Sequence, residues 1–176
     1  MIKRITNEKD FNTVLKSIDI ISVSQDKRSF YRDILDYITD AEEELTVLIY
    51  LLNEDLNQAT LVAERNLFSN YLRNFLVIKN RNKILWEVIR KNRIKIHRDL
   101  LNNDYADIEI KSLNKSTAFG VPINLVDNNA IGAIWILSNN EAKDLNDYTN
   151  LKNGLLEIGR KIASKEEVDS DKSGLH

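Results

Sequence analysis

Few residues in this chain are able to do acid–base or metal chemistry. It contains two histidines, His97 and His176, and no cysteine. A zinc site uses three or four histidine, cysteine or carboxylate ligands, so a site built on several histidines is excluded within one chain. The missing thiol excludes disulfides and thiol catalysis and favours a reducing compartment, which predicts a cytoplasmic protein.

Hydrolytic and nucleotide-dependent catalysis have no support in the sequence. There is no Gly-x-Ser-x-Gly motif, and a catalytic triad would have to use His97. The five glycines match neither nucleotide-binding fingerprint. For His97, two interpretations stay open: a surface or hydrogen-bonded histidine, and a contact to a ligand or haem. We therefore predict no catalytic residue, no metal site and no enzymatic activity.

Positive charge is concentrated in one stretch of the chain. Residues 79–98 contain eight lysines and arginines and one acid, Glu87, whereas residues 33–57 are acidic and the net charge is −2. Two interpretations remain: a solvated face, and an anion-binding rim for a nucleotide, a phosphorylated metabolite or an acidic protein. Duplex DNA requires several aligned phosphate contacts, and no recognition-helix motif is present, so nucleic acid is not an expected partner.

Alternating helical and strand patterns organise the first half of the chain. A helix is expected over residues 27–43, because Asp26 is a suitable N-cap and apolar residues recur at helical spacing. Residues 45–52 are apolar on both strand faces, which predicts a central strand covered on two sides. Residues 53–57 form a turn, and 59–64 form the returning strand. The pattern leaves residues 66–80 open.

The second half repeats this alternation. A helix is predicted over 83–91, a short strand over 93–98, a hairpin of strands 116–126 and 130–137, and a final helix over 146–164. Pro122 predicts an edge position or a bulge in its strand. In the final helix, Leu151, Leu155, Ile158 and Ile162 form an apolar seam, which favours a helical homodimer together with the face of helix 27–43.

The chain divides into three predicted parts. Residues 1–25 are expected to form an N-terminal helical extension, residues 26–164 one domain, and residues 165–176 a disordered polar tail. The beginning has no apolar run resembling a signal peptide, and the longest apolar stretch, 45–52, is far too short to span a membrane. No membrane partner is therefore expected.

The order helix, hairpin, helix, strand, hairpin, helix resembles the GAF domain family. The match rests on residues 84–99 (Ile-Leu-Trp-Glu-Val-Ile-Arg-Lys-Asn-Arg-Ile-Lys-Ile-His-Arg-Asp), on Val121-Pro122-Ile123 within 116–123, and on Ile131-Gly132 opening the next strand. The resemblance implies an α+β fold with an antiparallel sheet of five or six strands. It places long helices on one face, where members commonly dimerise, and short helices over a small-molecule pocket on the other.

The resemblance also implies a non-enzymatic sensory or regulatory function. Without cysteine, a covalently attached bilin and the methionine-sulfoxide-reducing branch are excluded, and haem could be ligated only by His97. No Asn-Lys-x-Phe-Asp-Glu arrangement like that of cyclic-nucleotide-binding members is present, so no cofactor is identified. Since no effector domain follows, the signal is expected to pass to a separate effector protein.

The expected ligand is small, and the basic stretch favours an anionic one. The residues expected to bind it come from the helix, strand and loop that enclose the pocket, and are Trp86, Arg90, His97, Arg98, Tyr105 and Phe119. An alternative stays open: a protein–protein adaptor or scaffold whose pocket is vestigial. A large cavity lined by aromatic residues and Arg90 or Arg98 would favour the sensor, and a pocket filled by Trp86 and Phe119 would favour the adaptor.

Overall fold

The computed structural model describes residues 21–39, 45–124, 129–139 and 149–174. The helix predicted before residue 21 and the turn at 127–128 lie outside these ranges. The elements, in chain order, are α2 (Lys27–Ile38), β1 (Thr46–Leu52), β2 (Gln58–Arg65), α3 (Ser69–Phe75), β3 (Val77–Lys79), α4 (Lys83–Lys91), β4 (Lys95–His97), the 3₁₀ helix η1 (Leu100–Asn102), α5 (Ile108–Ser112), β5 (Thr117–Ile123), β6 (Gly132–Ser138) and α6 (Thr149–Ser173).

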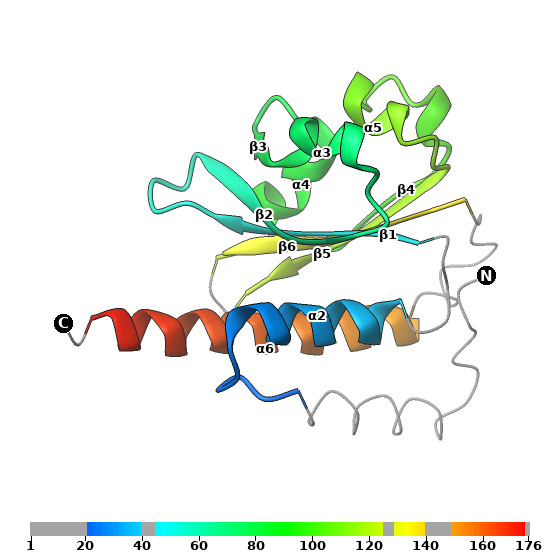
Figure 1. The fold of residues 1–176 in the computed structure, drawn as a ribbon. Helices are drawn as coiled ribbons and strands as arrows, with labels where there is room; N and C mark the ends of the chain where they lie inside the picture. Colours follow the sequence, from blue (N-terminus) through cyan, green and yellow to red (C-terminus); the bar gives the residue numbers. More distant parts are fainter. Residues whose placement is uncertain (1–20, 40–44, 125–128, 140–148, 175–176) are drawn as a thin grey trace.

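Six antiparallel strands form one sheet in the order β3-β2-β1-β6-β5-β4. The two long helices, α2 and α6, cover one face, and the short helices α3, α4 and α5 lie on the other (Figure 1). Each face has its own apolar cluster. The predicted α+β class, the antiparallel sheet and the division of long and short helices between its two faces are confirmed.

The central strand β1 shows why both faces are covered. Val47 and Ile49 point to the α2/α6 face, whereas Leu48 and Tyr50 point to the short-helix face, and all four are fully buried. Side chains alternate along a strand, so a run that is apolar throughout must be buried on both sides. The prediction of a two-sided central strand is confirmed.

Helix α2 begins where the sequence indicated. The side chain of Asp26 accepts a hydrogen bond from the backbone N–H of Ser29 at 3.0 Å, which satisfies one of the free donors at the helix start. The helix ends at Ile38, and the hydroxyl of Thr39 donates to the carbonyl of Leu35 at 2.7 Å. Its expected continuation to residue 43 therefore stops earlier, and residues 40–44 lie outside the described ranges.

Helix α6 packs directly on the sheet. Leu155, Ile158 and Ile162 are buried in the cluster beneath α2 and α6. A Cβ at Gly159 would lie 3.2 Å from the carbonyl oxygen of Pro122, so this glycine lets the helix approach β5 closely. These three residues of the apolar seam predicted for a dimer interface thus serve the core of the single chain.

The prediction of a disordered tail from residue 165 is wrong as far as Ser173, because α6 continues to that residue. Lys165 is 1% exposed, and its ammonium donates to the carbonyl of Gln25 at 2.6 Å and to Asp169 at 3.1 Å. The polar composition of this segment reflects a helix that is exposed to solvent on one side and hydrogen-bonded to the segment just before α2 on the other. Residues 175 and 176 are outside the described ranges.

Pro122 occupies neither an edge strand nor a bulge. It lies in β5, between β6 and β4, and pairs in regular register with Ala133. However, β4 pairs only with residues 118–120 of β5, so Pro122 lies beyond its end. The missing N–H therefore costs no ladder hydrogen bond on that side, which explains how an interior strand tolerates proline.

Candidate functional site

The structure brings together some of the predicted ligand residues and separates others. Trp86 is 9% exposed within the apolar cluster of the short-helix face. His97 is half-buried at the end of β4, and Tyr105, in the loop before α5, is 41% exposed. Arg90 and Arg98 are exposed, and neither forms an ion pair with any residue that the structure describes. Both arginines therefore lie at solvated positions, and the expected contact of the segment from Arg90 to Arg98 with an anionic ligand stays a prediction.

Phe119 lies on the wrong face of the sheet for the predicted pocket. It is 2% exposed and belongs to the cluster beneath α2 and α6, whereas its neighbour Ala118 belongs to the cluster beneath the short helices. The reason is strand alternation, which sends consecutive side chains to opposite faces. Phe119 and Trp86 are consequently separated by the sheet, and the prediction that both line one pocket is wrong.

Four polar side chains meet where α4 lies beside β4, and we call them the Glu87 cluster: Glu87, Lys91, Lys95 and His97. The carboxylate of Glu87 is 2.5 Å from Lys91 Nζ, 3.1 Å from Lys95 Nζ and 2.9 Å from His97 Nε2. Glu87 itself is 5% exposed. A buried carboxylate requires such partners, because an unpaired buried charge is strongly destabilising.

The protonation states in this cluster follow from its geometry. Burial alone would raise the pKa of Glu87, but hydrogen bonds from Lys91 and Lys95 and the charges of Lys95 and His97 outweigh it and lower the pKa to about 2. Burial lowers the pKa of His97 from its ordinary value, against the opposing effect of Glu87. An ionised carboxylate only accepts hydrogen bonds, so neutral His97 must carry its proton on Nε2 and donate it to Glu87.

Aromatic rings hold His97 in place. Its ring lies 6.5 Å from that of Tyr105, with an interplanar angle of 17°, and 6.3 Å from that of Trp135. Lys83 Nζ lies over the Tyr105 ring, 5.6 Å from its centre. The cluster therefore combines a buried charge network with an aromatic ring that reaches solvent. His97 is hydrogen-bonded, as one of its two sequence interpretations held.

Trp135 forms the floor of this region. It is fully buried, and its indole N–H donates to the carbonyl of Leu85 at 3.1 Å. A Cβ at Gly120, its partner across the strands, would lie 2.8 Å from the indole ring. Glycine at this position thus makes room for the ring to lie over β5. Trp135 thus lies beneath α4, and Trp86 is buried in the same apolar cluster.

Sequence reasoning missed Glu87, Lys91 and Lys95 as members of the site. Two signals were available. Glu87 and Lys91 are four residues apart on one helix, a spacing that brings opposite charges together. Lys95 and His97 share one face of a strand because they are two residues apart. What the sequence could not supply is that this helix face and this strand face are turned toward each other.

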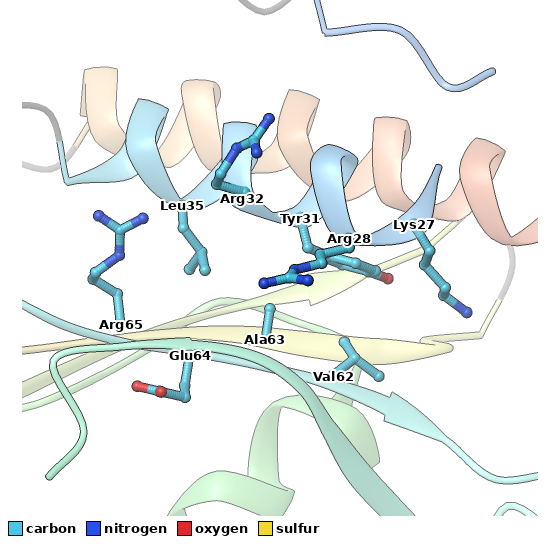
Figure 2. A pocket seen from close by; sticks show the side chains of 9 residues that line it. All are labelled: Lys27, Arg28, Tyr31, Arg32, Leu35, Val62, Ala63, Glu64 and Arg65. Carbon is cyan, nitrogen blue, oxygen red and sulfur yellow. The ribbon is translucent and has the colours of Figure 1, made fainter. Parts of the chain in front are cut away.

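A groove lies on the opposite face of the sheet, between α2 and β2. It has a volume of about 570 Å³. We call it the α2–β2 groove, and its lining residues are Lys27, Arg28, Tyr31, Arg32, Leu35, Val62, Ala63, Glu64 and Arg65 (Figure 2). None of the residues predicted to bind a ligand lines this groove.

In the described ranges, no group of three or more histidine, cysteine or carboxylate side chains is placed to hold a metal ion. In the same part of the chain, no helix has the length and apolar character needed to cross a membrane.

Comparison with known proteins identifies the fold. No family model matches the chain, and no curated protein matches it. Among solved structures, it is similar to the GAF domain of a phosphoenolpyruvate-protein phosphotransferase from Coxiella burnetii, with a TM-score of 0.76, 11% identity, and coverage of 96% of this chain and 99% of that one. The corresponding domain from Acinetobacter gives 0.71 at 14% identity, covering 94% and 99%.

Enzymes are also among the structural neighbours. Free methionine-R-sulfoxide reductase from Neisseria meningitidis, in complex with its substrate, has a TM-score of 0.74 at 14% identity, and 98% of each chain is covered. Because identities are this low, the likenesses establish the fold alone. The chain has a GAF-like fold, as its sequence resemblance indicated.

Proposed function

We propose that this chain is a non-enzymatic regulatory domain that binds a small anionic ligand at the Glu87 cluster and passes a signal to a separate protein. The observation that carries the proposal is the cluster itself. Half-buried ionisable groups with displaced pKa values, gathered beside aromatic rings, are typical of functional sites. The absence of cysteine from the chain supports a function other than that of the reductase neighbours.

The charge balance favours an anion. One carboxylate, that of Glu87, faces the two ammonium groups of Lys91 and Lys95, which leaves an excess of positive charge even with His97 neutral. Arg98 and Arg90 are exposed nearby in sequence and add to the local potential without forming a closed clamp. A ligand carboxylate or phosphate would compete with Glu87 for the lysines, while Tyr105 offers a ring for a planar group.

The sheet provides a route for the signal. His97 pairs with Ala118 on β5, and the next residue, Phe119, contacts the core beneath α2 and α6. A ligand shifts the packing of these helices only if it binds one arrangement more tightly than another. We further propose a homodimer. Because the apolar faces of α2 and α6 are in the core, its interface would use their outward faces.

The test combines a search for retained ligand with matched variants. Native mass spectrometry of the freshly purified chain is followed by thermal-shift screening of nucleotides, phosphorylated metabolites and amino acids. Anionic compounds should raise the Tm of wild type and of the exposed control Lys152→Met, but not that of Lys95→Met. If Lys95→Met responds as wild type does, or if only neutral compounds stabilise the chain, the proposal is wrong.

The adaptor function remains the second candidate, and one observation favours it. Trp86 and Trp135 are both buried in the apolar cluster of the short-helix face, while large apolar side chains are exposed on the short-helix layer, including Phe68 at 74% and Ile108 at 80%. Exposed apolar surface of this kind is typical of protein contacts. A chain that retains no ligand, responds to no compound, and loses a purified partner on Ile108→Glu substitution would support the adaptor.

A further inference from the structure

The α2–β2 groove is formed by one face of a helix and a bulged strand. The residues that α2 contributes recur over two helical turns, from Lys27 to Leu35, so they share one face. In β2, Ala63 pairs with Ile49 and Leu61 with Tyr50, which leaves Val62 as the extra residue of a β-bulge. Val62 and Ala63 consequently both pack on the α2 side, where they form an apolar floor with Leu35.

The rim of this groove is basic on both sides. Lys27, Arg28 and Arg32 come from α2, and Arg65 comes from β2. The acid that lines the groove, Glu64, accepts a hydrogen bond from the N–H of Leu67, and Figure 2 shows its side chain directed away from α2. Among the lining residues, the charged groups left to face an occupant are therefore those of the four cations.

Three of these four cations form ion pairs with carboxylates of the same chain, so carboxylates are groups that the rim is able to bind. Arg65 pairs with Asp36, Arg32 with Asp33 at 3.4 Å, and Lys27 with Glu166 at 3.1 Å. Pairs as exposed as these contribute about 0–1 kcal/mol each, so a partner's carboxylates can replace them at little cost.

Arg28 differs from the other cations of the rim. It is exposed and has no ion pair with any residue in the described ranges. In Figure 2 its guanidinium reaches from α2 across toward Ala63, over the apolar floor. It is thus placed to meet a carboxylate entering from solvent.

We propose that the α2–β2 groove docks an acidic amphipathic helical segment of a separate protein. Apolar residues of that segment cover Leu35, Val62 and Ala63, and its carboxylates engage Arg28 and Arg32. These two arginines are one turn apart, about 6 Å along α2, which matches carboxylates four residues apart on a facing helix. The groove is on the opposite face of the sheet from the Glu87 cluster and shares no residue with it, so peptide binding here can be measured without the small ligand.

The experiment measures fluorescence anisotropy of a labelled synthetic helical peptide titrated with the full chain. The peptide, of about four turns, carries a leucine stripe flanked by glutamates four residues apart, and a matched peptide has lysines in place of the glutamates. We expect the acidic peptide to bind and the basic one not to bind. Arg28→Glu should weaken binding at least about tenfold, since it turns attraction into repulsion at a central contact. Arg73→Glu, an exposed charge reversal on α3, should bind as wild type does.

Several outcomes would overturn this proposal. Equal binding of the two peptides, equal affinity of wild type and Arg28→Glu, or no binding would each show that the groove does not recognise an acidic segment. Sedimentation distinguishes a second copy: a dimer lost on Arg28→Glu substitution would make the occupant another copy of this chain. Competition by a peptide of residues 1–20 would instead identify the chain's own N-terminal segment. Failure of the small-ligand proposal would leave all these results unaffected, because they report on the other face.

Discussion

At the scale of single residues, small side chains are as decisive as charged ones. Gly120 lies in regular strand register, and its importance is the space that it leaves. A Cβ there would lie 2.8 Å from three atoms of the Trp135 indole. A Cβ at Gly154, in α6, would have no atom of another described segment within 4 Å. The fold therefore requires glycine at position 120, where the indole of Trp135 occupies the space of a side chain, but does not require it at position 154.

Gly120→Ala should destabilise the fold by about 1–3 kcal/mol, because the buried indole must move to admit a methyl group. The matched change Gly154→Ala should stabilise it by up to about 1 kcal/mol, since alanine is the better helix former and meets nothing. Urea unfolding followed by circular dichroism measures both. Equal effects of the two substitutions would contradict the packing described for Trp135.

Glu87 should make stability depend on acid. Its pKa is lowered to about 2 in the folded chain, below the ordinary value of 4.5, so its stabilising contribution is complete above that ordinary value and is lost as the pH falls toward 2. The contribution is on the order of 2–3 kcal/mol. Glu87→Gln should therefore be less stable than wild type at pH 7, and the difference should shrink on acidification.

Urea titrations of both proteins between pH 7 and pH 2.5 give this difference, and Glu54→Gln, at an exposed position, is the control. A constant difference between wild type and Glu87→Gln across this range would show that the carboxylate is not held by Lys91 and Lys95.

At the scale of elements, a polar network joins the two long helices. Glu166 of α6 accepts a hydrogen bond from the hydroxyl of Tyr31 at 3.0 Å and pairs with Lys27. The residue just before it in α6, Lys165, donates to the carbonyl of Gln25 at 2.6 Å. These contacts explain how the polar end of α6 stays docked with few apolar residues of its own.

Lys165→Met should loosen that junction. The change retains a long side chain but leaves the carbonyl of Gln25 and the carboxylate of Asp169 without their donor, which costs about 1–3 kcal/mol. Relative to wild type, the variant should show faster amide hydrogen exchange in residues 165–173 and unchanged exchange in the β1–β6 ladder. Lys172→Met, at an exposed position on the same helix, should leave exchange unchanged. Uniformly faster exchange throughout the chain would instead indicate a global effect.

At the scale of the whole molecule, the core consists of two separate apolar layers, one on each face of a single sheet. The proposed ligand cluster and the proposed docking groove lie on opposite faces of the sheet. The strands between them and their buried side chains are therefore the connection between the two sites. Both long helices use their apolar stripes inside the chain, which leaves outward faces that are mostly polar.

Self-association should consequently be weak. We expect sedimentation equilibrium to show a monomer–dimer exchange with a dissociation constant of micromolar order or weaker, as polar and limited interfaces give. The dimer should dissociate further at high salt, because exposed charges would contribute to it. A strict monomer at 100 μM would refute the homodimer proposal, and a dimer insensitive to dilution would show that a larger apolar interface exists elsewhere.

The sequence by itself determined the fold class and most of the longer elements, but it left residues 66–80 open, where α3 and β3 form, and indicated neither η1 nor α5. The capping residue Asp26, the two-sided apolar run of β1 and the alternation in β6 act over a few residues, and such local patterns directly reflect which side of an element is buried. The same local rule could have corrected the prediction for Phe119. Consecutive residues of a strand point to opposite faces, so Phe119 and Ala118 cannot both face the predicted pocket. The resemblance to GAF domains then arranged these elements correctly.

Only the tertiary structure decided which surfaces meet. Glu87 on α4 and His97 on β4 are ten residues apart and come together because a turn folds the helix back over the strand. Arg28 and Ala63 share a groove because β2 is bulged beside α2, and Lys165 is buried because the start of α2 lies against it. Each of these features depends on contacts between distant segments, and a pattern read along the chain carries no information about which faces are turned toward each other.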